Sequence, residues 1–422
     1  MSAAVAGSPW RPVIGMATSV GLVYLPIFAV PPLITTFVDD LGFTHSHTGA
    51  LMSVCLAAFL VGSLVSGRAA ARFGTVRLIL ASLVLCGIAT ACFGITASLG
   101  PMLVCRVAIG LAGGLVYAPG VTLVTTLLPP AKANLGVGVF LCGLSVGGTI
   151  AYFATRFVSE ELDWRWPFWI FGALILAGAA VVAALCAGVP RIPAGAAREA
   201  AVGIRTMLSQ PSFRVLVPTL YLALFTAYGV FTWIPPYLDE SAGFSTAQVS
   251  FTSALMTLAG IPATFGVGWL AYRTGKPLVI AAAGLTLPAL LAAFAVTSTP
   301  SPGGATAVAT LASFGVSGGL APLYALPPIL FGAAAGATAS GFAAASAMAG
   351  AVTSTYLGGW IIGATGYDAA FWIYAVTAVV TGLCLVPFIA RTLALGRTDG
   401  EADVLGREAA EGRVRPEVET AP

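Results

Sequence analysis

Charged side chains are scarce in this sequence of 422 residues: only 8% are Asp, Glu, Lys or Arg, whereas 58% are hydrophobic. A soluble domain has about 25% charged residues, so this composition cannot form a water-soluble surface. Long apolar runs separated by short polar loops indicate a helical protein that crosses a lipid bilayer many times. The net charge of +3 is too small, and the basic residues are too dispersed, for nucleic acid as a partner.

Several chemical patterns are missing as well. At membrane depth the apolar runs contain no His, Asp, Glu or Lys, so they offer no catalytic set, and we do not expect an enzyme. There is no Gly-x-x-x-x-Gly-Lys-Ser/Thr loop, so ATP is not expected to drive the protein. The seven cysteines include no Cys-x-x-Cys pair, and we therefore expect neither a metal nor another cofactor.

Counting apolar runs of about 20 residues predicts an all-α membrane protein with twelve transmembrane helices. They lie near 13–38, 46–66, 78–97, 101–126, 134–157, 166–188, 214–238, 248–271, 278–297, 305–331, 338–363 and 369–390. The longest polar stretch between them divides the chain in half. The expected parts are an N-terminal segment 1–12, a six-helix bundle 13–188, a linker 189–213, a second six-helix bundle 214–390 and a disordered tail 391–422.

Basic residues are distributed unevenly among the predicted loops. With both termini in the cytoplasm, 16 of the 19 basic residues fall in cytoplasmic segments, and this bias sets the orientation of membrane proteins. We therefore predict a multi-pass protein of the inner (plasma) membrane, a monomer in the lipid bilayer, with both termini and the linker in the cytoplasm.

The sequence repeats itself at an offset of about 200 residues. The short basic turn 67–77 is echoed at 268–276, and the prolines 31–32 recur at 235–236. Further matches follow the same order: Gly42-Phe43 with Gly243-Phe244, Gly113-Gly114 with Gly318-Gly319, and Phe168-Trp169 with Phe371-Trp372. Two parallel halves of this kind are expected to be pseudo-symmetric about an axis along the membrane normal, with a shared cavity near mid-membrane.

These motifs resemble those of the major facilitator superfamily over about residues 10–392. The turn 67–77 is similar to the family's signature loop, Gly-x-Leu-Ala-Asp-Arg-x-Gly-Arg-Arg, and Arg106-x-x-x-Gly110-x-x-x-Gly114 resembles its span-four signature. The segment 228–248 is faintly similar to the cyanate and nitroimidazole transporters. The resemblance implies a secondary transporter that works by alternating access. On this basis we predict conformational, or gating, roles for Gly67, Arg68, Arg72, Gly74, Arg77, Gly268, Arg273, Gly275, Gly110 and Gly114.

One position departs from the signature. Its aspartate, which in the family pairs with a nearby arginine, is replaced by Ala71 in the first loop and by Tyr272 in the second. That ion pair cannot form here, and setting the topology is the alternative role for the arginines that remain.

Arg106 is a charge inside a predicted span, where it would cost about 2.5–3.5 kcal/mol if it were left uncompensated. Positions 106, 110, 113 and 117 share one helical face, so we expect two glycines to leave a groove beside the guanidinium, with Tyr117 closing it. Such a groove suits an anionic or polar ligand. The alternatives are that Arg106 reaches toward the membrane surface or bonds backbone carbonyls between helices.

Aromatic residues on spans one, four, seven and ten, which line the cavity in the family, complete the predicted substrate site. With Arg106, the predicted substrate-binding residues are Tyr24, Phe28, Tyr117, Tyr228, Trp233 and Tyr324. As a set they would pack around an apolar or planar ligand, although each by itself is more often plain packing or, for Trp233 and Tyr237, part of the aromatic belt at the membrane surface. Arg156 is read either as a partner of Glu160 and Glu161 or as a vestibule residue, and His45 and His47 are expected to face solvent.

The sequence thus predicts a secondary active transporter for a small solute, an organic or small inorganic anion, with proton coupling as one option. Arg106 in a membrane interior without carboxylates favours this class over cations. The alternative is an exporter of neutral hydrophobic compounds or drugs.

Overall fold

The computed structural model describes residues 8–189, 211–274, 277–297 and 301–386. The predicted linker and tail, and the start of the N-terminal segment, lie almost entirely outside the described residues. The first half contains α1 (Trp10–Phe28), η1 (Pro31–Leu33), α2 (Ile34–Leu41), α3 (His45–Phe73), α4 (Thr75–Phe93), α5 (Leu99–Leu127), α6 (Pro130–Glu161) and α7 (Trp166–Leu185). The second contains α9 (Pro211–Glu240), α10 (Thr246–Leu258), α11 (Gly260–Thr274), α12 (Pro277–Thr297), α13 (Pro302–Thr365) and a last helix, Tyr367–Val386.

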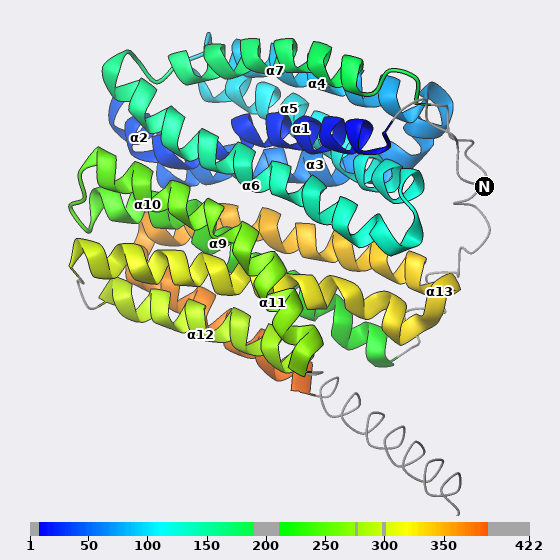
Figure 1. Cartoon of the computed structure of the whole chain (residues 1–422). Coiled ribbons are helices and arrows are strands. Elements are labelled where there is room, and N and C mark those ends of the chain that lie inside the picture. The colour runs from blue at the N-terminus through cyan, green and yellow to red at the C-terminus, as the bar shows by residue number, and fades with distance from the viewer. Residues whose placement is uncertain (1–7, 190–210, 275–276, 298–300, 387–422) are drawn as a thin grey trace, which may run out of the picture.

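The predicted twelve-helix architecture is confirmed. Eight segments of the described chain are long and apolar enough to cross a bilayer on their own, and α10–α11, α12 and two lengths of α13 make up the rest. The 64 residues of α13 would extend about 96 Å as a straight helix, three times the thickness of the hydrocarbon core. Instead, the yellow and orange lengths of α13 form two rows that meet at one end (Figure 1).

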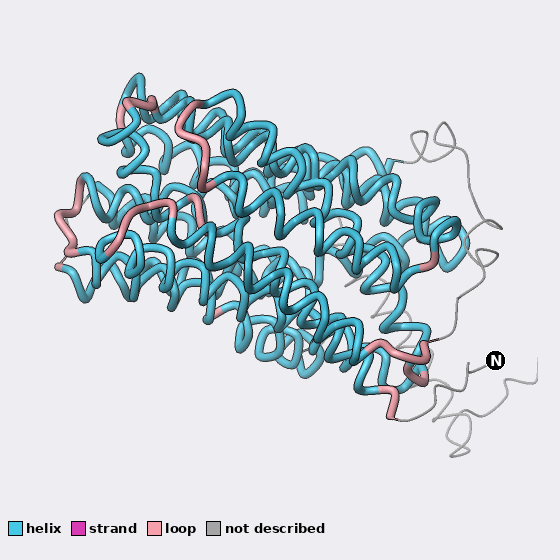
Figure 2. The backbone as a smooth tube through the Cα atoms, turned by 90° about the horizontal axis from the view of Figure 1, so that it is seen from above, coloured by secondary structure: helices cyan, strands magenta, loops and turns pink. Residues whose placement is uncertain are grey.

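Two layers of roughly parallel helices make up the molecule: the first half lies above the second in Figure 1. Seen from above, the loops gather at the two ends of the helices (Figure 2). One end, here called the Asp239 end, carries the turns 42–44, 162–165 and 241–245, and the opposite end, the Arg77 end, carries the turns at 74 and 128–129.

Local sequence explains the first span and the matching turns of the two halves. Pro31 and Pro32 have no N–H groups to continue the helix, so α1 stops at Phe28 and η1 and α2 complete the crossing. Gly42 and Gly243 both adopt a left-handed conformation, with φ of 66° and 65°, which glycine adopts without strain. Each is followed by a capping box, from Thr44 to His47 in one half and from Ser245 to Gln248 in the other.

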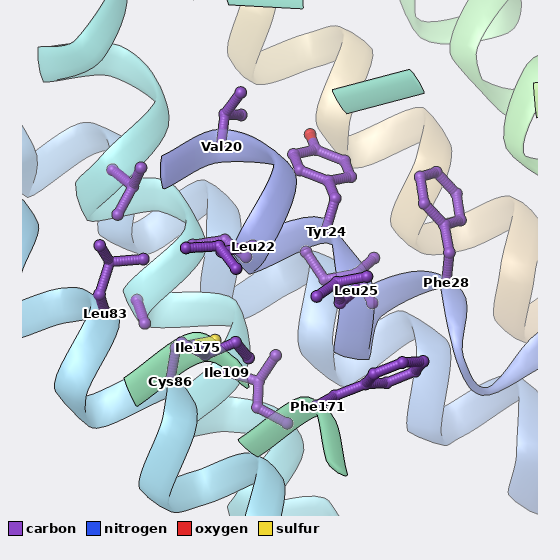
Figure 3. Close-up of a cluster of buried hydrophobic side chains, with 14 of the residues drawn as sticks. Val20, Leu22, Tyr24, Leu25, Phe28, Leu83, Cys86, Ile109, Phe171 and Ile175 are labelled. Atoms are coloured by element: carbon purple, nitrogen blue, oxygen red, sulfur yellow. The ribbon is translucent and has the colours of Figure 1, made fainter. Parts of the chain in front are cut away.

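Helix α1 has one side in the core of the first half and another toward the second half. Figure 3 shows Leu22 of α1 near Leu83 and Cys86, whereas Tyr24 and Phe28 lie on the side of α1 away from them. The two halves meet mainly where α3 packs on α13 and where α6 packs on α10. The side of α1 that faces away from Leu83 and Cys86 is therefore aromatic.

Candidate functional site

A connected row of aromatic rings lies inside the first half. The ring centroids are 5.5 Å apart for Tyr24 and Phe28, 6.2 Å for Tyr24 and Phe59, 5.9 Å for Phe59 and Tyr117, and 5.6 Å for Tyr117 and Phe140. Helices α1, α3, α5 and α6 each contribute at least one ring. Three of the predicted substrate-binding residues, Tyr24, Phe28 and Tyr117, therefore belong to one cluster, in which Phe59 and Phe140 are members that the sequence did not single out.

Two hydroxyl groups connect this cluster to the second half. The side chains of Tyr24 and Tyr228 share a hydrogen bond, which places a fourth predicted residue at the cluster. Tyr152 of α6 stacks near Phe28, with centroids 5.6 Å apart, and donates a hydrogen bond of 3.0 Å to the carbonyl of Phe231. We use the term central cluster for Tyr24, Phe28, Phe59, Tyr117, Phe140, Tyr152 and Tyr228.

Arg106 is completely buried, and it binds backbone carbonyls, one of the alternatives that its sequence left open. Its Nε donates to the carbonyl of Leu51 at 3.0 Å, one terminal nitrogen donates to Pro26 at 2.7 Å, and the other lies 3.3 Å from the sulfur of Met52. The first span is interrupted just after Pro26, so the guanidinium connects the end of α1 to α3. In this conformation, all three of these contacts of the guanidinium are made inside the protein.

The groove expected beside Arg106 is not there, which corrects the sequence interpretation. A Cβ on Gly110 would collide with the carbonyl of Cys55, and one on Gly114 would collide with the carbonyl of Phe59. A Cβ on Gly113 would lie 2.8 Å from the Phe59 ring. The glycines thus allow α5 and α3 to pack backbone to backbone, as small residues commonly do in membranes, and α3 fills the space.

Of the remaining two predicted substrate residues, only Trp233 has a described side chain, and it does not join the central cluster. Trp233 is fully buried beside His45, with ring centroids 6.2 Å apart. It packs against Gly49 of α3 and Gly358 of α13, so it lies at the seam between the halves. The alternative position in the aromatic belt at the membrane surface is therefore wrong for Trp233. The side chain of Tyr324 lies outside the described residues.

Ionic contacts between the halves gather at the Asp239 end. Arg156 of α6 pairs with Asp239 at 3.1 Å and donates to Thr246 at 3.3 Å, while the Thr35 hydroxyl donates to Asp239 at 2.7 Å. Arg156 was expected to pair with Glu160 and Glu161 or to face a vestibule. Its partner is instead an acid from the other half, because packing of α6 on α10 brings the end of α9 within reach.

His45 also corrects an expectation, since it was predicted to face solvent. Its Nε2 lies 3.1 Å from a carboxylate oxygen of Glu240, which also accepts a hydrogen bond of 2.8 Å from Tyr367. His47 serves the capping box of α3. Within the described chain, the hydrogen bonds between the halves named so far lie at the Asp239 end or at the central cluster, so this conformation is closed at the Asp239 end.

The predicted gating residues of the signature loop lie at the Arg77 end. Arg68, Arg72 and Arg77 are exposed, the guanidinium of Arg72 lies 5.4 Å from the Phe73 ring centroid, and Gly74 ends α3 with φ of 89°. Gly67 meets open space. A cavity of about 340 Å³ adjoins this loop, and its lining includes Gly74, Arg77, Leu123 and Cys186. In the echo, Gly268 and Arg273 belong to α11, and Gly275 lies outside the described residues.

No group of three or more His, Cys, Asp or Glu side chains in the described ranges is arranged to hold a metal ion. Around the central cluster, the polar groups available to a solute are hydroxyls. The site therefore offers ring faces and hydroxyl hydrogen bonds, with the buried charge of Arg106 farther along α5.

The sequence profile of the Major Facilitator Superfamily matches residues 16–346. The chain belongs to this superfamily. The niacin transporter NiaP of Acinetobacter baylyi is 25% identical over 281 residues, which are 59% of this chain and 64% of that protein. The 3-(3-hydroxy-phenyl)propionate transporter of Escherichia coli is 24% identical over 349 residues, 81% of this chain and 85% of that protein. The match spans less than two thirds of the length of NiaP and of two further curated relatives, at 64%, 64% and 55%.

A crystal structure of a bacterial homolog of the human lysosomal transporter Spinster, inward-facing and occupied, has the same fold. The TM-score is 0.71 with 19% identity, over 93% of this chain and 98% of that one. The predicted family and twelve-helix fold are thus confirmed.

Proposed function

We propose that this chain is a secondary active transporter that moves a small, planar organic anion across the membrane by alternating access. One observation carries the proposal: the central cluster draws its rings from four helices of one half and is hydrogen-bonded to the other half through Tyr24 and Tyr228. A solute held there would contact both halves, which alternating access requires.

The aromatic rings favour a planar solute. Rings that lie 5.5–6.2 Å apart can pack against the face or edge of a further ring, and such pairs contribute about 0.5–1.5 kcal/mol each. The hydroxyl of Tyr117 and one hydroxyl of the Tyr24–Tyr228 pair can donate to a carboxylate, while that of Tyr152 already donates to the carbonyl of Phe231. Niacin and 3-(3-hydroxyphenyl)propionate, which name two relatives, both combine one aromatic ring with one carboxyl group.

The charge of Arg106 favours the anion. Its three nitrogens bond two carbonyls and a thioether sulfur, so its positive charge has no acid partner among the described residues. Tyr117 is eleven residues away on α5, or about 16 Å along the helix. At an effective dielectric constant of about 20, a unit charge at that distance stabilises an anion by about 1 kcal/mol, or roughly fivefold in affinity.

One observation supports the second candidate, a transporter of neutral hydrophobic compounds. Arg106 is fully buried and bonded to protein on all three nitrogens, so it cannot contact a solute in this conformation. A purely aromatic site would then carry neutral compounds equally well.

The test compares acids with their neutral amides in proteoliposomes that contain purified protein. Nicotinate and 3-(3-hydroxyphenyl)propionate are the acids, and nicotinamide and the corresponding propionamide match them in shape. We expect each acid to be transported at least fivefold faster than its amide. Equal rates would favour the neutral-solute candidate, and an amide preference would contradict the anion proposal.

A further inference from the structure

Helix α10 presents a row of hydroxyls to the other half. Thr246, Ser250, Ser253 and Thr257 are spaced by four, three and four residues, so they share one helical face. The first of them accepts a hydrogen bond from Arg156 of α6, at 3.3 Å. The methyl group of Thr257, the last of them, would lie 2.5 Å from a Cβ placed on Gly148 of α6. This face therefore packs on α6, and we call it the α10 hydroxyl face.

The two middle hydroxyls of this face have no protein partner. Ser250 and Ser253 are 4% and 2% exposed, and neither Oγ makes a hydrogen bond. On the facing helix, Nε of Arg156 and the hydroxyl of Thr155 are also buried without a partner. Each unmet group of this kind costs about 1–3 kcal/mol. Four of them at one interface between the halves call for a polar ligand that satisfies several at once.

The row of hydroxyls continues away from the Asp239 end. Thr252 on a neighbouring face of α10 bonds Thr306 of α13 at 2.9 Å, and the buried Ser313, two turns on in α13, also lacks a partner. Gly260 lies where α10 ends and α11 begins. A Cβ placed on Gly260 would lie 3.3 Å from Oγ of Ser145 on α6 and 3.5 Å from Oγ of Ser317 on α13. Hydroxyls thus extend from the Asp239 pair to the level of Gly260.

We propose that the seam between the α10 hydroxyl face and α6 binds a file of ordered water molecules, and that this file carries a proton between Asp239 and the interior of the molecule. Water fits because one molecule makes two to four hydrogen bonds to buried polar groups and serves as both donor and acceptor. The water site stands on the unpartnered groups alone, whereas the proton route rests on the proposed transport function.

The proton step balances without a further reactant. A proton from the aqueous phase at the Asp239 end adds to a carboxylate oxygen of Asp239, which becomes neutral, and the same proton later passes through the file to the carboxylate of the bound anion. While it is bound, Arg156 loses its ionic partner in the other half, and the closed Asp239 end is weakened. The titratable groups at this end are Arg156 on α6, which pairs with Asp239, and the adjacent Glu240, which is bonded by His45 on α3 and by Tyr367 on the last helix.

Radiolytic hydroxyl labelling with mass spectrometry tests the water, because radicals formed from bound water modify buried side chains beside it. Tyr152 and Met256 lie one turn from Thr155 and Ser253, and Tyr374 and Met16 are equally buried controls of the same residue types. We expect at least tenfold faster labelling of Tyr152 and Met256 than of their controls, and a fall to control rates in Ser250→Ala/Ser253→Ala. Equal rates in the wild type would overturn the proposal.

Transport tests the proton route. Ser250→Ala/Ser253→Ala should lower accumulation of nicotinate driven by a proton gradient at least tenfold, while exchange of nicotinate without a gradient stays within twofold. The matched control is Ser66→Ala/Ser82→Ala, which removes two buried hydroxyls that bond their own helices. Wild-type accumulation in the seam variant would refute the proton route. If neither acid is transported by the wild type, the proposed function fails, and the labelling result still decides the water site.

Discussion

Replacing Gly359 by alanine should open the Asp239 end of the molecule. Gly359 lies where α13 crosses α3, and a Cβ there would collide with the carbonyl of His45 and lie 3.0 Å from the Trp233 ring. On the facing helix, a Cβ on Gly49 would lie 2.7 Å from the carbonyl of Thr355. Since the two helices touch through backbone atoms, a side chain cannot rotate away, and the helices must separate.

The packing cost of this substitution applies only to the conformation that is closed at the Asp239 end. Overpacking costs about 1–3 kcal/mol, and it applies when α3 and α13 are in contact but is relieved when the halves part at this end. A differential of that size changes the ratio of the two conformations by about 5–150-fold. Gly359→Ala should therefore raise the population that is open at the Asp239 end by that factor.

Spin labels on Asp40→Cys and Ser241→Cys, which are exposed on opposite halves at this end, report the separation by pulsed electron resonance. Gly363→Ala is the control, because it lies one turn further on the same helix and a Cβ there meets open space. We expect a longer distance population in Gly359→Ala and none in Gly363→Ala. A lower melting temperature with an unchanged distance distribution would refute the reasoning, because the cost would then fall on both conformations.

Three further predictions follow from the cluster, the buried charge and the topology. Arg106→Ala should lower the melting temperature and should lower the preference for acids over amides about fivefold. Arg106→Lys should keep this preference and lose only stability. An unchanged preference in the alanine variant would contradict the electrostatic argument. Tyr24→Phe and Tyr228→Phe remove the same hydrogen bond, worth about 1 kcal/mol, so in thermal or denaturant unfolding the double variant should be no less stable than either single variant. In a background without native cysteines, a membrane-impermeant maleimide added outside should label Asp40→Cys but not Arg77→Cys, and the reverse pattern would invert the proposed orientation.

The sequence was most informative where structure is local. Apolar run length predicted the helices, and the repeated glycine and capping residues of the two halves adopt the same conformation because a left-handed turn and a capping box need only a few adjacent residues. The family was predicted from motifs of the same short range. Four of the predicted substrate residues do meet in one cluster, since each lies on a helix that the family places at the cavity.

Long-range partners could not be predicted in the same way. The acceptors of Arg106 are carbonyls of residues 26 and 51, and a carbonyl has no signature in the sequence because every residue carries one. Glycines beside a charged residue are compatible with either a groove or a close contact between helices. In the structure they make a close contact with α3. Arg156 had acids nearer in the sequence, but the partner that it meets depends on how α6 and α10 cross.

Two contacts between equivalent positions locate the pseudo-symmetry axis. Tyr24 and Tyr228 are 204 residues apart, as are Thr35 and Asp239, and the prolines 31–32 recur at the same spacing. Residues related by a two-fold axis can touch each other only if they lie beside that axis, so it passes through both pairs. The axis thus runs from the closed Asp239 end into the central cluster. At the cluster the paired residues are identical, so a solute there meets the same hydroxyl from each half. At the end they differ: Arg156 donates to the Thr35 hydroxyl at 3.2 Å and pairs with Asp239 at 3.1 Å, so of this pair only the second-half residue is a carboxylate, which a proton can neutralise.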